Sequence, residues 1–374
     1  MTDRGTAVLV GAGHAHLWVA RHADRFVRAG HRLVMIDPGT FWYSGLATGM
    51  LSGMYPPDQD QLDPRQLIER QGGEFVAARV TAIDTARRRL QLDNGTTLHY
   101  DALSLNIGSE IADDRLTGQD NVWTVKPISS LWRLRQRLEA QFRTGERPRL
   151  VVVGGGPTGS EIAASLDALA RRFDQSPQVT LISRSERLIS GNAAGAGCQL
   201  ARALAGRGIE LRLGQRVTDI EPDRVWIDNH PPVSFDHLIL ATGLKAQRLV
   251  RTLGLPFDDE AGLKVTDRLQ SIGDSRVFAV GDCADIGNYQ LPKLGVFGVR
   301  AAPVLGHNLL AVLQQKPLNT YRPQQRYLAI LNLGDGRGLA TWGPLWWQGR
   351  ISLWLKDRID RRFMNSYRQV YQSA

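Results

Sequence analysis

The sequence predicts an α/β fold organised around two glycine-rich turns. Three observations support this prediction: an apolar strand leads directly into a glycine-rich turn over 6–13, the same pattern recurs over 149–159, and each turn is followed by a helix and a second apolar strand. Strand, turn, helix and strand in this order form the unit of a parallel sheet that is covered by helices. We therefore expect two such units in one chain.

Length and composition agree with a globular protein of more than one domain. The chain has 374 residues, of which 43% are hydrophobic, and this suffices for two or three domains with cores of their own. No stretch of 18 uncharged apolar residues occurs, and the amino-terminal residues enter a strand at once, so we expect a cytoplasmic protein that neither spans a membrane nor is secreted. The net charge of +9 favours an anionic partner, which charge alone leaves open between nucleic acid, phospholipid and phosphorylated ligands.

The first turn carries the features of a dinucleotide site. Gly11 and Gly13 allow backbone N–H groups at the start of the helix to meet a pyrophosphate, and the helix is expected to run to about Ala29. Asp37 ends the second strand, where a carboxylate accepts hydrogen bonds from a ribose diol.

The same turn departs from the usual fingerprint, because His16 stands where a third glycine is expected. Three interpretations are open: a damaged nucleotide site, a metal-binding pair of His14 and His16, or a functional variant. A metal site needs three or four ligands, and the turn offers no Cys, Asp or Glu beside the two histidines. We therefore predict no metal at this turn.

The second turn has the full spacing of a dinucleotide fingerprint. Its expected contacts to the cofactor come from Gly154, Gly156, Thr158 and Gly159. The strand that follows ends in Ser183 and Arg184, with Arg187 close behind, so the carboxylate that would bind a bare ribose is missing. Arginine binds phosphate oxygens in pairs, and we expect this site to accept NADPH, with a solvated arginine surface as the alternative.

Three more apolar strands end in glycine turns. Two of them, over 99–109 and 235–244, end near Gly108 and Gly243 and are the expected crossings between the two domains. The third, over 276–285, ends in Gly281 and Asp282 and precedes a helix expected from about Phe297. An aspartate at such a strand end can bind the ribityl or pyrophosphate region of a larger dinucleotide, so the first site is expected to hold FAD.

These elements in this order resemble the two-dinucleotide-fold flavoproteins, which include type II NADH dehydrogenases, ferredoxin reductases and disulfide reductases. The resemblance covers almost the whole chain. The stretches GAGHAH, FWYSGLATGMLSGMY, PKLGVFGVRAAP, YRPQQRYLAILNLGDGRGLATWGPL and LKDRIDRRFM are most similar to the NADH-dehydrogenase-like flavoprotein that is associated with, or fused to, selenophosphate synthase. That subfamily ends its FAD turn in a small residue and a histidine, which implies that His16 is a packing variant in an intact site.

The resemblance also implies roles for individual residues. Glu161 is expected to steer the nicotinamide ring, although an acid in the first turn of a helix is also favoured by the helix dipole. Lys293 is expected to add positive charge near the reduced flavin, with a solvated loop lysine as the alternative. Residues 41–50, among them Ser44, are expected to border the flavin and an apolar second substrate. The redox cysteine pair of disulfide reductases has no counterpart, and Cys283 is expected to be a small helix-start residue near the flavin, with a redox role as the alternative.

The reaction implied by these assignments is hydride transfer from NAD(P)H to FAD, followed by transfer of two electrons to a quinone. Two alternatives stay open: reduction of a soluble acceptor or protein partner, and a nucleotide-binding redox sensor or scaffold with negligible turnover. Nucleic-acid binding is not expected, because the basic residues are spread along the chain without interleaved aromatic residues.

The carboxyl-terminal region decides whether the protein meets a membrane. From Gly343 onward the sequence contains three tryptophans, and apolar residues recur every fourth position at Ile351, Leu355, Ile359, Phe363 and Tyr367. Basic residues, including Lys356, fill other positions, which is typical of a helix lying in a membrane interface. The same stripe could instead pack on the protein's own sheet or on a partner.

The expected organisation is therefore discontinuous. It consists of an FAD domain formed by 1–117 and 244–318, an NAD(P) domain over 118–243, and an α+β module over 319–374. Expected partners are a quinone and the inner face of a membrane contacted peripherally, with a homodimer as an open alternative to a monomer.

Overall fold

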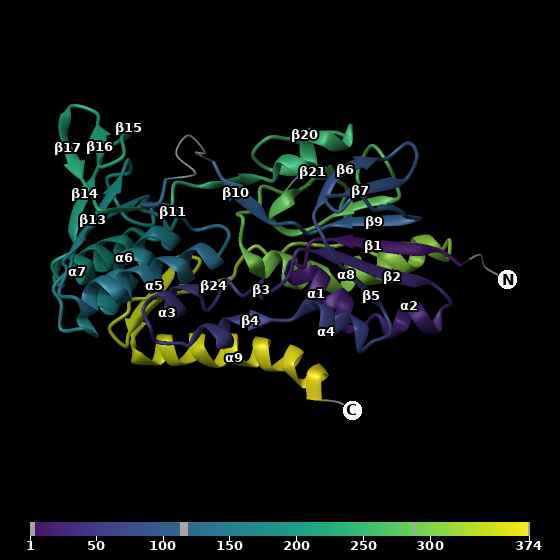
Figure 1. Cartoon of the computed structure of the whole chain (residues 1–374), viewed down its shortest axis with the longest axis horizontal. Helices are drawn as coiled ribbons and strands as arrows, with labels where there is room; N and C mark the ends of the chain where they lie inside the picture. Colours follow the sequence, from purple (N-terminus) through teal and green to yellow (C-terminus); the bar gives the residue numbers. More distant parts are fainter. Residues whose placement is uncertain (1–3, 113–118, 288, 373–374) are drawn as a thin grey trace.

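The computed structural model describes residues 4–112, 119–287 and 289–372 of the chain. Its first sheet is parallel, with the strand order β22-β9-β1-β2-β5 (Figure 1). The strands are β1 (Thr6–Val10), β2 (Arg32–Asp37), β5 (Glu74–Ala77), β9 (Ala102–Leu105) and β22 (Val277–Ala279). In β1, β2, β9 and β22 the central residues are mostly apolar and buried, as a parallel sheet covered on both faces requires, whereas the edge strand β5 is only half-buried.

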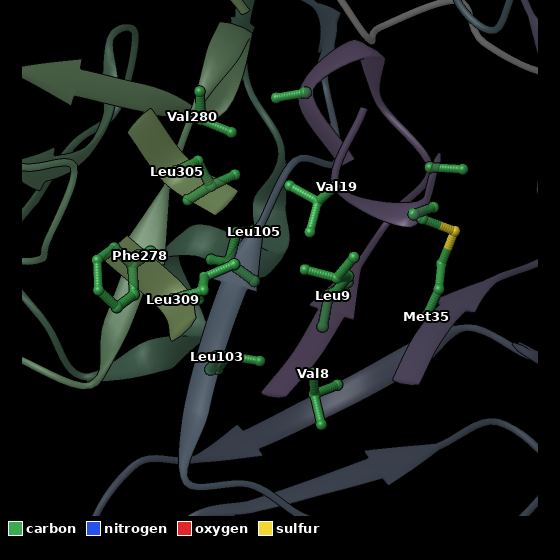
Figure 2. Packing of buried hydrophobic residues seen from close by; sticks show 14 of the residues in the cluster. Val8, Leu9, Val19, Met35, Leu103, Leu105, Phe278, Val280, Leu305 and Leu309 are labelled. Atoms are coloured by element: carbon green, nitrogen blue, oxygen red, sulfur yellow. The ribbon is translucent and has the colours of Figure 1, made fainter. Parts of the chain in front are cut away.

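Two helices that are far apart in the sequence cover one face of this sheet. The helix α1 (His14–Arg21) follows the first turn, and α8 (Gly295–Leu313) packs along it after the chain has passed through the second domain. Figure 2 shows Val19 of α1 and Leu305 and Leu309 of α8 meeting the strand residues in one core. The first helix ends earlier than expected, since α1 stops at Arg21 and a separate short helix, α2 (Asp24–Arg28), follows it.

The second sheet is also parallel, with the order β11-β18-β12-β13-β14. Its strands are β11 (Val122–Thr124), β12 (Arg149–Val153), β13 (Gln178–Ser183), β14 (Glu210–Leu213) and β18 (His237–Leu240). Its helices are α5 (Ser129–Arg143), α6 (Pro157–Arg171) and α7 (Ala194–Ala205). All these elements lie between β9 and β22 in the chain. The expected domain limit at 117 and 118 lies outside the described residues.

Short antiparallel sheets accompany the two parallel ones. The first domain carries β6 (Val80–Asp84), β7 (Arg89–Leu92) and β8 (Thr97–His99), and the second carries β15 (Val217–Ile220), β16 (Arg224–Ile227) and β17 (His230–Ser234). Smaller elements are β3 (Phe41–Trp42), α3 (Ala47–Leu51), η1 (Pro57–Asp60), β4 (Gln61–Leu62), α4 (Pro64–Glu69), β10 (Ser109–Ile111), β19 (Leu244–Ala246), η2 (Arg248–Leu253), β20 (Phe257–Asp258), β21 (Gly262–Val265), η3 (Gly281–Cys283) and β23 (Ala284–Ile286).

The carboxyl-terminal module is an antiparallel sheet followed by a long helix. The sheet consists of β24 (Leu328–Asn332), β25 (Gly338–Trp342) and β26 (Leu345–Gly349), and the helix is α9 (Arg350–Gln372). The helix, yellow in Figure 1, runs along the lower edge of the molecule, from below the second domain to α4 of the first. The predicted α/β fold with two Rossmann-like domains is confirmed by this architecture.

One prediction about α9 is wrong in its details. Helical spacing does place Ile351, Leu355 and Ile359 near one side, but the stripe does not continue as a single exposed face. Ile351 is 76% exposed, whereas Tyr367 is only 3% exposed, because the second half of the helix packs on the first domain. Lys356 is not an outward-facing basic residue either, since its ammonium group is held inside the protein by Asp360.

The helix α8 is long and apolar enough to cross a membrane by length and composition, and it is the one such helix in the described part of the chain. In the fold it lies against α1, β1 and β9, and its side chains Phe297, Ala301 and Leu305 are buried there. Its hydropathy is therefore accounted for by packing in the core of the first domain.

Candidate functional site

The first glycine-rich turn is held in place by Asn106, a residue that the sequence analysis did not single out. Its side-chain oxygen accepts hydrogen bonds from the backbone N–H groups of Ala15 at 3.0 Å and His16 at 3.3 Å. Its amide nitrogen donates to Val280 O at 2.8 Å, and so Asn106 connects the turn to the ends of β9 and β22. The approach is close enough to require glycine, since a Cβ on Gly13 would lie 2.3 Å from the Asn106 side-chain oxygen. The available signal was a polar residue at the end of an apolar strand.

His16 supports this turn from beneath. Its ring is fully buried, with Nδ1 at 2.6 Å from Gly11 O and Nε2 at 2.7 Å from Ser104 Oγ. A carbonyl oxygen only accepts, so Nδ1 carries the proton and Nε2 accepts from the serine hydroxyl. Burial lowers the pKa of His16 to about 3, so the ring is neutral. A histidine thus occupies the position of the third glycine, and both of its ring nitrogens have hydrogen-bond partners inside the protein.

His14 points away from His16 and belongs to an aromatic cluster. Its ring meets Phe41 at 5.2 Å, Tyr43 at 5.6 Å and Phe363 at 5.8 Å between ring centroids. Burial and the nearby charge of Lys126 lower the pKa of His14 to about 4. The two histidines therefore have separate environments, and this arrangement is unlike a metal-binding pair.

Asp37 stays at the end of β2 beside the turn. Its carboxylate accepts from Ala12 N at 2.8 Å and from Gly39 N at 2.9 Å. Burial raises the pKa of Asp37, while these two N–H groups favour the ionised form. The side chain is thus fixed at the carboxyl edge of the sheet, where a ribose would lie.

A second group of polar residues gathers at the end of β22. Ser109 donates to Asp282 Oδ2 at 2.7 Å, and the Lys126 ammonium lies 4.0 Å from the same oxygen. Lys293 donates to Ala261 O at 2.9 Å and to Asp282 O at 2.5 Å, and burial lowers its pKa. Gly281 adopts a φ of +73° beside this group, which favours glycine.

A cavity of about 500 Å³ lies beside this group. Gly281, Asp282, Lys293 and Phe297 form part of its wall, and α8 begins there. Cavities of roughly 300–1,000 Å³ hold cofactors and drug-sized ligands. The glycine cradle around Gly11 and Gly13, the carboxylate of Asp37 and this cavity together fit a flavin dinucleotide, with the positive end of α8 facing it.

The second turn is built for close backbone contact. A Cβ on Gly159 would lie 1.9 Å from Gly154 O, and one on Gly154 would lie 2.2 Å from Ala241 O. Gly156 is the N-cap of α6, no side chain caps it, and the space beside it is open. Thr158 is exposed in the same first turn. A helix start with open space and free N–H groups fits a pyrophosphate.

The two arginines after β13 differ in their surroundings. Arg184 is exposed, which agrees both with a phosphate-binding role and with a solvated surface position. Arg187 is half-buried against α7 and donates to Ser190 O at 3.1 Å, and its Nε is buried without a partner. Ser183 is buried at the strand end and accepts from Ser185 N at 3.2 Å.

Glu161 lies between the second turn and the carboxyl-terminal sheet. Its carboxylate accepts from Asn332 N at 2.6 Å and from Thr48 Oγ1 at 3.3 Å. Burial raises the pKa of Glu161, and the charge of Lys356 opposes that rise. The contact with Thr48 joins the NAD(P) domain to residues 41–50, which the sequence analysis placed beside the second substrate.

The structure thus sorts the predicted residues into two groups. At the carboxyl edge of the first sheet and around its cavity lie Gly11, Gly13, His14, Asp37, Gly108, Gly281, Asp282, Lys293 and Phe297. At the edge of the second sheet lie Gly154, Gly156, Thr158, Gly159, Glu161, Arg184, Arg187 and Gly243. Ser44 is exposed on the loop between β3 and α3.

The two cysteines lie in different surroundings. Cys283 is buried in η3, its Sγ donates to Leu105 O at 3.4 Å, and burial raises its pKa to about 11. Cys198 is exposed on α7. A thiol whose pKa is raised by burial is a poor nucleophile, so the packing interpretation of Cys283 agrees with its geometry.

Comparison with known proteins adds a family and two relatives. The family model described as pyridine nucleotide-disulphide oxidoreductase matches residues 5–302. An NADH dehydrogenase-like protein of Mycobacterium tuberculosis is 28% identical over 385 residues, covering 97% of this chain and 94% of that protein. A demethylphylloquinone reductase of Synechocystis is 26% identical over 371 residues, covering 92% of this chain and 90% of that protein.

Two solved structures share the fold. The sulfide:quinone oxidoreductase of Aquifex aeolicus has a TM-score of 0.81 and 16% identity, covering 98% of this chain and 92% of that one. The structure of NDH2 from Plasmodium falciparum in complex with NADH has a TM-score of 0.80 and 14% identity, covering 99% of this chain and 98% of that one.

Proposed function

Because this chain belongs to the pyridine nucleotide-disulphide oxidoreductase family, we propose that it is an NAD(P)H:quinone oxidoreductase. The family and the relatives establish an oxidoreductase whose cofactors are FAD and NAD(P)H. The proposal concerns the acceptor, the place of action and the residues. It is carried by one observation: Thr48 of the apolar stretch 41–50 touches Glu161 at the start of α6, so a nicotinamide site and an apolar acceptor site meet there.

Bound FAD would supply the redox chemistry, by accepting a hydride and passing on two electrons. The protein's residues would position the reactants. Gly154, Gly156 and Gly159 would hold the pyrophosphate of NAD(P)H, and Glu161 would orient the nicotinamide. The positive end of α8 and the ammonium of Lys293 would favour negative charge at the flavin edge of the cavity.

The acceptor is proposed to be a quinone because residues 47–51 are buried and apolar around Thr48, and an uncharged ring suits such a surface. The name of the Synechocystis relative, a demethylphylloquinone reductase, supports the same acceptor class. A particular relation to the flavoprotein associated with selenophosphate synthase is part of the proposal, and it rests on sequence stretches such as 321–345, which form β24 and β25.

Anaerobic stopped-flow absorbance tests this function. We expect NADH or NADPH to bleach the bound flavin rapidly and a short-chain quinone to restore its absorbance rapidly. Bleaching without recovery would favour a soluble acceptor instead, and a flavin that neither nicotinamide reduces would favour a redox sensor or scaffold.

Coenzyme choice gives a separate prediction. Changing Arg184 to alanine should lower kcat/KM for NADPH at least about tenfold and leave that for NADH within about twofold, because a charge-assisted bond to the 2′-phosphate is worth roughly 1.5–3 kcal/mol. Steady-state kinetics with both coenzymes measures this. Arg224→Ala, which removes an exposed arginine paired with Asp223 on the β15-β16-β17 sheet, is the matched control. Equal losses for both coenzymes, or none, would assign Arg184 to the solvated surface.

The place of action is proposed to be the inner face of a membrane. An exposed apolar rim formed by β25, β26 and the start of α9 supports this; its members are Trp342, Leu345, Trp346, Trp347, Ile351 and Trp354. Arg358 lies over the Trp354 ring at 5.7 Å, and indoles beside basic residues are typical of headgroup contact.

Point substitutions test the membrane contact better than removal of α9, because this helix also carries buried residues of the fold. We expect Ile351→Ser combined with Trp354→Ser to weaken binding to anionic liposomes at least about tenfold, since two large apolar groups would each lose roughly 1.5–3 kcal/mol of burial. Sedimentation with vesicles measures this, and Trp226→Ser, at an exposed tryptophan of β16, serves as control. Unchanged sedimentation would point to a partner subunit for the rim.

A further inference from the structure

A cluster of ionisable side chains is buried between α9 and the segment that runs from β3 to β4. We call it the buried acid–base cluster, and its members are Tyr43, Asp60, Glu161, Lys356 and Asp360. The loop after β3 and the helices η1, α6 and α9 supply these residues. Asp60 is fully buried and Asp360 is 5% exposed, although carboxylates are rarely buried unless they are paired or have a function.

The centre of the cluster is a continuous hydrogen-bonded path. Tyr43 OH donates to Asp360 Oδ1 at 2.9 Å, and Lys356 Nζ donates to Asp360 Oδ2 at 2.9 Å. The same ammonium donates to Gly45 O at 2.6 Å, on the loop that leads to α3. The loop lies tight against the path, since a Cβ on Gly45 would be 2.7 Å from Asp360 Oδ1. The path therefore ends at the residues proposed to border the acceptor.

The Asp60 carboxylate lies beside this path, whereas the backbone oxygen of the same residue accepts from Tyr43 N at 2.8 Å. Both of its carboxylate oxygens are buried and lack a partner, an arrangement that costs free energy and calls for an explanation. Burial, followed by the negative charge of Asp360, raises the pKa of Asp60 to about 8, while Lys356 and Arg368 oppose this rise. Asp60 is thus a neutral acid at pH 7, next to a fixed charge pair.

Other groups complete the surroundings. On the outer side, Arg368 of α9 donates to Asp58 O at 2.7 Å and lies at the protein surface near η1. On the inner side, the Glu161 carboxylate accepts hydrogen bonds from Thr48 and Asn332, and the positive charge of Lys356 lowers its pKa. Tyr367 of α9 helps to raise the pKa of Tyr43, and the negative charge of Asp360 helps to raise the pKa of Tyr55. The cluster therefore spans from the surface at η1 to the start of α6.

The stoichiometry of the proposed reaction requires a proton from water. NAD(P)H gives up two electrons and one proton as its C–H bond breaks, whereas a quinol has gained two electrons and two protons in two new O–H bonds. We propose that the buried acid–base cluster delivers this second proton, from solvent near Arg368 through Asp60 and the Asp360–Lys356 pair to Glu161 and the acceptor loop. Asp60 gives up a proton inward and regains one from solvent, so no other reactant is needed. This inference rests on the proposed quinone reduction.

The kinetic test uses the holoenzyme and the variant Asp60→Asn, which keeps the size of the side chain and breaks no hydrogen bond of the structure. We expect bleaching of the flavin by NAD(P)H to stay within about twofold of wild type. Recovery by a short-chain quinone should slow at least about tenfold between pH 6 and 8, the scale of general acid catalysis, with an increased solvent deuterium isotope effect. Asp357→Asn is the control, since this half-buried carboxylate of α9 pairs with Arg361 and accepts from Tyr55 OH at 2.8 Å but makes no contact with the Tyr43–Asp360–Lys356 path.

A second readout does not depend on turnover. Infrared difference spectra of the holoenzyme between pH 6 and 9 should show the band of one protonated carboxylic acid that titrates, and this band should be missing in Asp60→Asn. Absence of such a band from wild type, or a quinone step of unchanged rate and pH profile in Asp60→Asn, would overturn the inference. If wild type reduced no quinone at all, the proposed function would fail first, and the infrared titration would still report on the cluster.

Discussion

Gly159→Ala is expected to reduce the rate at which NAD(P)H bleaches the bound flavin by at least about a hundredfold, because a displacement of roughly 1 Å in a positioned reactant has this effect. The added methyl group has no room, since its carbon would lie 1.9 Å from Gly154 O. The start of α6 must therefore move away from the turn, and the pyrophosphate and nicotinamide positions move with it. Stopped-flow bleaching at saturating coenzyme measures the effect.

Two controls separate this effect from unfolding. The variant should still bind FAD in a one-to-one ratio, because the flavin residues belong to the first sheet. Gly156→Ala has open space around the new methyl group, so the free protein should keep its thermal stability while its affinity for NAD(P)H falls. A Gly159→Ala enzyme that bleached at the wild-type rate would show that the second turn does not hold the coenzyme.

Asp60→Asn is expected to stabilise the protein, and to do so more strongly as the pH rises. The pKa of Asp60 is raised from its ordinary value of 3.8 to about 8. A group with a raised folded pKa imposes no penalty below its unfolded pKa, and an increasing one as the pH climbs to the folded pKa. At about 1.4 kcal/mol per pH unit, the penalty above pH 8 is on the order of 5 kcal/mol, and asparagine removes it.

Thermal unfolding at several pH values measures this difference. Between pH 5 and 9 the Tm of Asp60→Asn should rise relative to wild type by roughly 5 °C, and the difference should level off above pH 8. Asp357→Asn, at a half-buried carboxylate of α9 that pairs with Arg361, is measured alongside as the control. A constant Tm difference across the range would mean that Asp60 is already ionised when folded, which would also remove the proton donor from the buried acid–base cluster.

The fold could be predicted because its signals are local. Each glycine-rich turn lies between an apolar strand and a helix, and Gly154 and Gly159 stand at the spacing that the close contact requires. The discontinuous sheet could also be anticipated, because the strand ending in Gly281 and Asp282 repeats the pattern after the second turn. The interpretation of His16 as a packing residue agrees with its burial, although its partner Ser104 lies 88 positions away.

The rest depends on contacts that no local pattern carries. Asn106 holds the first turn through hydrogen bonds to the start of α1 and to Val280 after β22, and its sequence context is only a polar residue after a strand. Helical periodicity places apolar residues inside and charged residues outside, and on that basis Lys356 was expected on the outer face. A buried charged residue is an exception that periodicity does not reveal. Its burial follows from Asp360 one turn later and from Gly45, which lies 311 positions away.

The interleaved order of the two sheets has a consequence for the newly made chain. Strands β1, β2, β5 and β9 leave the ribosome early, yet β22, which pairs with β9, and α8, which covers α1, follow only after the entire second sheet. Domains fold as units during synthesis, and contacts between distant segments form slowly. The inserted domain can therefore fold first. Until β22 and α8 have been made, the β9 edge of the first sheet stays unpaired and α1 stays uncovered. The proposed flavin site is complete only when η3 and α8 have been made, and α9, made last, packs across both domains.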